Sequence, residues 1–316
     1  MWEAIMQNSP HRNPPLQAAG KPVAEVSAGW RPFLELHASI LLAGFTGLFG
    51  RWLPLNEGVL VCCRSGMTAG ILLLVLTVTG RSPRLPVRDA VRIGAVGSLL
   101  AIHWVLFYGS IKASNVSIGV VSFSTIGFFS ALLEPWFERS RTRWTNLGLS
   151  LLSLAGVALI FHFDFRYRTG ILLGVACAVF AALFTILSKR ETRRGAPEIL
   201  LFWEMTGGTI LLLPLLPLCL RIFPHGGAMG ARELLLLFLL SSVFTVLLYL
   251  LQIRVLKSVS AFTVNLSYNL EPVYSILLAM LFFGEARELH GSFYAGILLI
   301  LSSVLLLSLH EKKKNA

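Results

Sequence analysis

The residues of this sequence with the clearest chemical potential are charged and polar side chains that lie inside long apolar stretches. Glu271 is the sharpest example, because it lies near the middle of the apolar stretch 261–283. A charged side chain at the centre of a membrane-spanning helix costs about 2.5–3.5 kcal/mol on insertion scales, so it is a functional candidate by default. Polar and aromatic residues surround it in the sequence: Asn265, Tyr268, Asn269 and Tyr274. This group predicts the wall of a substrate-binding cavity, with Glu271 as a candidate proton-coupling residue. The alternative is a structural hydrogen bond from Glu271 to a neighbouring helix.

The spacing around Glu271 places aromatic side chains on the same side of a helix. Tyr268, Glu271 and Tyr274 are three residues apart, a spacing that drifts slowly around one helix face. Pro272 has no backbone N–H, so it is expected to free the carbonyl of Tyr268. A loosened backbone beside a carboxylate is compatible with a ligand site.

A second candidate group lies in the stretch 91–111, where His103 and Trp104 are followed one turn later by Tyr108. Histidine titrates near neutral pH, so His103 is a candidate for proton coupling, and the aromatic rings could enclose a ligand. The alternative for His103 is a hydrogen bond between helices. Tyr249 and Gln252, near the end of the stretch 234–253, are further candidates for the cavity wall.

Three more ionisable residues lie inside or at the ends of apolar stretches. Glu134 precedes Pro135 and is a third candidate for proton coupling, although it could instead reach water or pair with nearby arginines. Arg64 and Glu204 lie at similar depths in two different stretches, and each is expected to anchor its own half of the protein without pairing with the other.

The composition indicates where these residues must sit. Hydrophobic residues make up 55% of the 316 positions, charged residues 14%, and the mean hydropathy is +0.73. A soluble domain has roughly 25% charged residues, so much of this surface must face lipid. Lipid offers no partner for backbone groups, which leaves helices or closed barrels. Apolar runs such as 234–240 do not alternate as barrel strands do, so the sequence predicts an all-α integral membrane protein.

The apolar stretches predict ten membrane spans, since about 20 apolar residues cross the hydrocarbon. The predicted spans are 33–49, 58–78, 91–111, 116–137, 147–163, 170–188, 199–220, 234–253, 261–283 and 293–309. Residues 1–32 are expected to form a flexible cytoplasmic tail, and residues 311–316 a basic cytoplasmic tail.

The distribution of positive charge predicts the orientation. With ten spans, most of the 27 Lys and Arg residues fall on the side that holds both termini. Such a bias marks the cytoplasmic side, so both termini are expected in the cytoplasm. The net charge of +11 is thereby explained without a nucleic-acid partner. The four cysteines lie inside apolar stretches without metal-type spacing, so no metal or cofactor is expected.

An internal repeat is visible between the segments that begin at Leu132 and Leu278. Glu138 and Glu285 end corresponding spans, and Gly148 and Gly296 follow at nearly equal distances. This predicts two five-helix repeats, 33–165 and 166–310. Because five is odd, the second repeat must enter the membrane in the opposite sense, as in many secondary transporters.

The sequence also resembles a known family. The segment Asn269-Leu270-Glu271-Pro272-Val273-Tyr274, followed by Gly284-Glu285, resembles EamA-type transporters of the drug/metabolite transporter superfamily over roughly residues 33–310. His103-Trp104, Phe107-Tyr108 and the segment 124–135 are similar to a bacterial branch of that family. The first half departs from the pattern, with Thr125 where a proline is expected and Phe137-Glu138 in place of Gly-Glu. The resemblance implies export of amino acids, metabolites or drugs across the bacterial inner membrane by alternating access through a central cavity.

Two function classes remain at this stage. A secondary transporter is favoured, with a small-molecule substrate, surrounding membrane lipid and no ATP-binding motif. The alternative is a polytopic membrane enzyme acting on lipid-linked substrates, but the loops are short and basic and show no paired acidic motif. Small-residue pairs at Gly44 and Gly47, and at Gly66 and Gly70, predict close helix packing, either within one chain or in a homodimer.

Overall fold

The computed structural model describes residues 30–141, 143–161, 167–223, 226–284 and 291–314. All regular elements in these ranges are helices, which confirms the predicted all-α class. Most of the predicted N-terminal tail, Glu285, and the end of the predicted span 147–163 lie outside the described residues. The first seven α-helices are α1 Trp30–Trp52, α2 Glu57–Val78, α3 Val87–Ala113, α4 Val116–Phe123, α5 Ile126–Glu138, α6 Trp144–Phe161 and α7 Arg168–Glu191. The remaining elements are α8 Pro197–Ile222, α9 Ala231–Ser241, the π-helix η2 Ser242–Leu247, α10 Leu248–Leu256, α11 Ala261–Ser267, the 3₁₀-helix η3 Tyr268–Leu270, α12 Glu271–Phe283 and α13 Gly291–Lys314.

Eight helices of the described chain are long and apolar enough to cross a membrane. They are α1, α2, α3, α7, α8 and three composite helices, α4–α5, α9–η2–α10 and α11–η3–α12. The chain is therefore a multi-pass membrane protein. Helix α1 begins at Trp30, inside the segment predicted to be a flexible tail.

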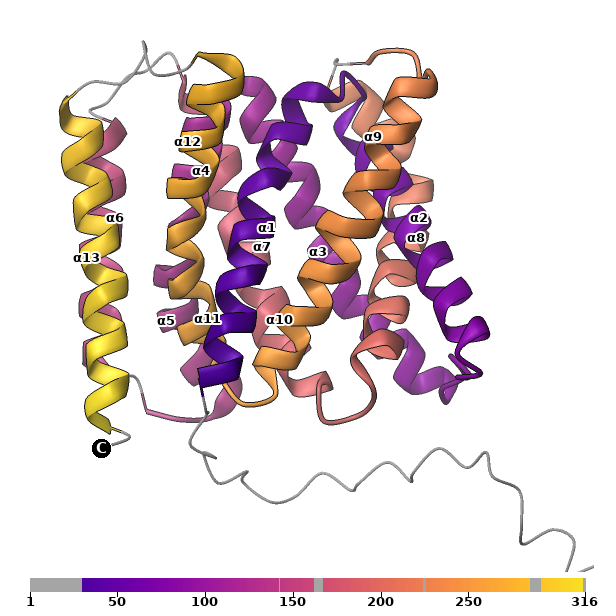
Figure 1. Ribbon diagram of the computed structural model, residues 1–316, viewed down its shortest axis with the longest axis horizontal. Coiled ribbons are helices and arrows are strands. Elements are labelled where there is room, and N and C mark those ends of the chain that lie inside the picture. The colour runs from indigo at the N-terminus through magenta and orange to yellow at the C-terminus, as the bar shows by residue number, and fades with distance from the viewer. Residues whose placement is uncertain (1–29, 142, 162–166, 224–225, 285–290, 315–316) are drawn as a thin grey trace, which may run out of the picture.

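The helices form a bundle with a separate pair at one edge (Figure 1). Helices α6 and α13 pack against each other at that edge, while α3 packs against α7 and α8 in the main body. Helix α4 contacts α12 and α5 contacts α11, so the two composite helices lie side by side and antiparallel. The first turn of α1 and the end of α13 lie at the same end of the bundle (Figure 1).

Glycines let α3 and α8 pack very closely. A Cβ atom added to Gly97 would lie 1.8 Å from the carbonyl oxygen of Glu204, and one added to Gly207 would lie 2.2 Å from that of Gly94. Small residues at such positions let helix backbones approach each other, where dispersion contacts then hold them together. Gly94, Gly97 and Gly207 are not among the small-residue pairs predicted to pack.

The predicted small-residue pairs have mixed surroundings. Gly44 lies against α12, where an added Cβ would meet the Cβ of Tyr274 at 2.7 Å, and Gly47 lies against α4. Gly66 faces Thr209 of α8 at ordinary contact distance, but Gly70 has open space around its Cα. Three of the four glycines thus pack within the chain.

Both antiparallel composite helices are interrupted in the middle. Ser124 and Thr125 separate α4 from α5, and η3 separates α11 from α12. The expectation that Pro272 frees the carbonyl of Tyr268 is wrong, because that oxygen accepts the backbone N–H of Glu271 in the 3₁₀ turn. A tighter i to i+3 bond takes the place of the bond that proline removes.

Ion pairs connect several helices at one end of the bundle. Glu191 at the end of α7 accepts from Arg92 of α3 at 2.9 Å and from Arg194 at 3.1 Å. Lys189, also near the end of α7, lies 3.7 Å from Glu138 at the end of α5. The ends of α5 and α7 and the start of α3 therefore lie on the same side of the membrane.

Candidate functional site

A small cavity of about 40 Å³ lies between helices from both halves of the chain. The first-half helices that line it are α1, α2, α3, α4 and α5, and the later elements are α7, α10, α11, η3 and α12. Its polar lining consists of Thr46, Arg64, His103, Trp104, Thr185, Tyr249, Gln252, Asn265, Tyr268 and Glu271. Its apolar lining consists of Ala43, Leu100, Phe107, Phe123, Ile126, Ala181, Phe184 and Leu248. The interruptions of both composite helices face this space, since Phe123 and Ile126 flank one and Tyr268 and Glu271 the other.

Glu271 is the acidic side chain of the cavity wall. It is the first residue of α12, directly after the 3₁₀ turn, and only 3% of its surface is exposed. Its carboxyl group has no hydrogen-bond or ion-pair partner among the residues that the structure describes. The start of a helix presents the positive end of the backbone dipole, which favours a carboxylate there. The side chain is thus available to a ligand or a proton.

Arg64 of α2 is the basic side chain of the same wall. Its Nε donates to Thr245 Oγ1 at 2.8 Å, and its Nη1 donates to Tyr108 Oη at 2.9 Å. Its Nη2 lies 3.5 Å from the carbonyl oxygen of Phe244, and its Cζ lies 3.7 Å from the centroid of the Trp104 ring. Arg64 and Glu271 face one cavity without forming a direct ion pair with each other.

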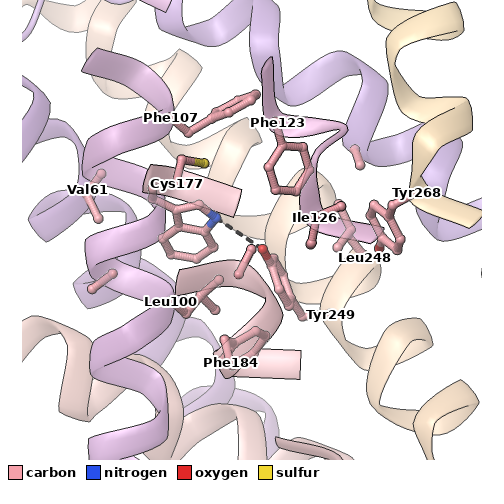
Figure 2. Close-up of a cluster of buried hydrophobic side chains, with 14 of the residues drawn as sticks. Val61, Leu100, Phe107, Phe123, Ile126, Cys177, Phe184, Leu248, Tyr249 and Tyr268 are labelled. Carbon is pink, nitrogen blue, oxygen red and sulfur yellow. Dashed lines mark hydrogen bonds between the residues drawn. The ribbon is translucent and has the colours of Figure 1, made fainter. Parts of the chain in front are cut away.

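A cluster of aromatic rings forms one side of the cavity (Figure 2). The indole Nε1 of Trp104 donates to Tyr249 Oη at 3.1 Å, the bond drawn as a dashed line. Phe184 lies edge-on to Tyr249. On the other side of the cavity, Tyr268 donates to Ser39 Oγ at 3.2 Å. These bonds fix the polar ends of the rings at the cavity wall.

His103 of α3 is held by α7. Its Nδ1 lies 3.3 Å from the carbonyl oxygen of Cys177 and 3.0 Å from Cys177 Sγ. The imidazole ring stacks on Phe107. Nε2 has no partner among the described residues, so this nitrogen is the one available toward the cavity.

The structure brings most of the predicted cavity residues together. Those that line the cavity are Glu271, Asn265, Tyr268, His103, Trp104, Tyr249 and Gln252. Those outside its lining are Asn269, Tyr274 and Tyr108. Asn269 donates to Ser153 Oγ at 2.7 Å, and Tyr274 Oη lies 2.7 Å from His37 Nε2. Tyr108 accepts a hydrogen bond from Arg64, which does line the cavity.

Glu134 lies outside the cavity. Its two carboxylate oxygens accept the backbone N–H groups of Ala261 at 3.0 Å and Phe262 at 2.9 Å, at the start of α11. Lys189 Nζ lies 3.9 Å away. Glu134 therefore caps a helix of the other half, a contact that no sequence pattern indicated.

The expected separation of Arg64 from Glu204 is also seen. Glu204 Oε1 accepts from Ser188 Oγ at 2.7 Å, between α8 and α7, and Glu204 does not contact Arg64. Arg64 was predicted only as an anchor, and its place in the cavity wall was missed. A buried arginine without a nearby acidic residue in the sequence could have suggested it.

The chain is similar to several bacterial proteins. It is 22% identical over 292 residues to the uncharacterized transporter YxxF of Bacillus subtilis, covering 89% of this chain and 90% of that protein. It is 29% identical over 299 residues to the uncharacterized transporter YvbV of the same organism, covering 89% and 95%. A solved crystal structure superimposes with a TM-score of 0.68 at 19% identity, over 89% of this chain and 98% of that one, which supports the fold.

Interrupted helices around a buried polar cavity define the chain as a polytopic membrane transporter. Residues 168–309, which begin at the first residue of α7, match the EamA-like transporter family. This match confirms the predicted resemblance to EamA-type transporters for that part of the chain, and the relatives named as transporters cover most of its length.

Proposed function

We propose that the protein is a secondary transporter that exports amino acids, small metabolites or drugs by alternating access through the central cavity. The observation that supports this most directly is Glu271, a buried carboxylate that has no hydrogen-bond or ion-pair partner in the described chain and faces the cavity at an interruption of a membrane helix. Helix interruptions that meet at a buried site are typical of transporters, where unwound segments contact substrate and coupling ions.

Two inverted repeats of five helices provide the proposed basis for alternating access. In support, α4–α5 and α11–η3–α12 are both 23 residues long, run antiparallel and are interrupted near the same position. Both end in a left-handed residue, Arg139 in one and Gly284 in the other. Ile126 occupies the place in the first that Glu271 occupies in the second, so a carboxylate lines the cavity from one repeat only. Rocking of the repeats would expose the cavity to each side in turn.

Glu271 and His103 are the proposed proton-coupling groups. Both are buried, both line the cavity, and each has an atom without a partner among the described residues. Glu134 is less suited to this role, because two backbone N–H groups occupy its oxygens. The proposed location is the cell membrane with both termini in the cytoplasm, which the basic residues on that side support.

The test is counterflow in proteoliposomes with a panel of labelled amino acids and organic cations. Wild type is expected to exchange at least one solute, and Glu271→Gln to lose that exchange while remaining folded. Glu138→Gln is the matched control, because this carboxylate lies at a helix end with a side chain that is 38% exposed. It is expected to exchange like wild type.

Equal exchange by wild type and Glu271→Gln would remove Glu271 from the transport site and leave transport itself intact. Absence of exchange for every solute in folded wild-type protein would overturn the proposed substrate classes.

A further inference from the structure

Resting on the proposed transport through the central cavity, we propose that Arg64 is its specificity-determining residue and selects substrates with a carboxylate group, while Tyr108 and Thr245 position its guanidinium. The guanidinium has five N–H groups, and its three bonds use three of them. One N–H on each terminal nitrogen remains. Two N–H groups on neighbouring nitrogens match the two oxygens of a carboxylate.

The protein groups bound to Arg64 do not neutralise it. Its partners are two hydroxyl groups and a carbonyl oxygen, all uncharged. A buried charge without a counter-charge is costly, and that cost falls when an anion binds. Arg64 is 1% exposed and lines the cavity, and Glu271 of the same wall attracts it through space without a direct ion pair, so its remaining N–H groups can bind an anion that enters the cavity.

The neighbours of Arg64 also fix its direction. Thr245 Oγ1 donates its single hydrogen to the carbonyl oxygen of Leu240 at 2.7 Å, so its lone pairs remain for Arg64. This bond spans five residues because Thr245 lies in the π-helix η2, a feature often found at functional sites. Trp104 supports the flat face of the guanidinium, an arrangement that suits arginine better than lysine.

Glu271 is the acidic side chain that shares the cavity with Arg64. The carboxylate faces the same cavity, yet the bonds to Thr245 and Tyr108 hold the guanidinium where no direct ion pair with Glu271 forms. The two charges therefore line one cavity without touching each other. The carboxylate of the ligand would bind Arg64, and a positively charged group, where present, would face Glu271.

The experiment measures ligand-induced shifts in melting temperature with three probes that share a phenyl ring. 3-Phenylpropionate has a carboxylate alone, phenethylamine an amine alone, and phenylalanine both. The readout is the ratio of apparent affinities for 3-phenylpropionate and phenethylamine, because a general loss of stability would not change this ratio. Wild type is expected to favour the carboxylate probe.

The variants test selection and positioning separately. Arg64→Gln is expected to lower the affinity for 3-phenylpropionate about tenfold or more, since a charge-assisted bidentate contact is lost. Arg64→Lys keeps the positive charge but lacks the pair of N–H groups on neighbouring nitrogens. Its affinity for 3-phenylpropionate should lie between those of Arg64→Gln and wild type. Thr245→Val and Tyr108→Phe should reduce the ratio without abolishing binding. Arg254→Gln removes an exposed arginine outside the cavity and should match wild type. If Arg64→Gln does not fold, Thr245→Val and Arg64→Lys still test the assignment.

The assignment is overturned if wild type shows no preference for 3-phenylpropionate, or if Arg64 and Thr245 variants keep the wild-type ratio. Failure here is distinct from failure of transport. Counterflow that depends on Glu271 but not on Arg64 would support transport and reject this inference. Carboxylate binding that depends on Arg64, without counterflow of any solute, would support the role of Arg64 in binding and reject the proposed transport.

Discussion

Glu134 and Glu271 are both buried glutamates in interrupted helices, yet their surroundings differ completely. Two backbone N–H groups and Lys189 satisfy Glu134, whereas Glu271 faces a cavity without a partner in the described chain. In the sequence the two look alike, as acidic residues next to proline in apolar stretches. Only the approach of α11 to α5 distinguishes a helix cap from a candidate transport residue.

The capping role of Glu134 gives a stability prediction. Glu134→Gln should cost about 1.5–3 kcal/mol, because hydrogen bonds to a charged group contribute that much and an amide offers one acceptor in place of two. The melting temperature in detergent is the measurement. Glu138→Gln serves as the control and should change little, since exposed ion pairs contribute about 0–1 kcal/mol. Equal effects of the two substitutions would contradict the capping role.

At the scale of elements, glycines decide how closely helices pack. The sequence marked Gly66 and Gly70 for packing, but Gly70 has open space around it, and the tightest contact lies instead between Gly97 and α8. Glycine spacing identifies faces that could pack closely. Which of them does so depends on the partner helix, and α3 and α8 are far apart in the sequence.

These glycines provide a matched pair of substitutions. Gly97→Ala places a methyl group 1.8 Å from the carbonyl oxygen of Glu204, so the backbones of α3 and α8 must separate. Overpacking typically costs about 1–3 kcal/mol, and a clash with rigid backbone should lie at the upper end. Gly70→Ala meets no atom within 4 Å and should be neutral or stabilising, because alanine favours helix by up to about 1 kcal/mol. The melting temperature of each variant, monitored by size-exclusion chromatography after heating, is the measurement. A Gly97→Ala protein that melts at the wild-type temperature would refute the close contact.

At the scale of the whole molecule, the ion pairs around Glu191 and Lys189 place the basic ends of several helices on one side. Arginines there exceed what the acidic residues neutralise, as expected for the cytoplasmic face. The start of α1 and the end of α13 lie at one end of the bundle (Figure 1). Both termini should therefore be on the same side of the membrane.

Reporter fusions test this topology in cells. Green fluorescent protein fused after residue 316 should fluoresce, and alkaline phosphatase at the same position should be inactive, because both termini are expected in the cytoplasm. The same reporters inserted after Gly227, between α8 and α9 and on the opposite side in the ten-span topology, should give an active phosphatase and no fluorescence. An active phosphatase at the C-terminus would reject the orientation.

The helical membrane class follows from the sequence, because a chain with 55% hydrophobic and 14% charged residues has few alternatives in lipid. The sequence also placed the helix ranges to within a few residues, because apolar length is a local property. The tertiary structure alone decided which polar residues share a cavity. Arg64 meets Thr245 and Glu134 meets α11 across more than a hundred residues of sequence. The π-helix η2 that orients Thr245 toward Arg64 has no sequence pattern of its own. Contacts between residues so far apart in the sequence form only when packed helices bring their side chains together.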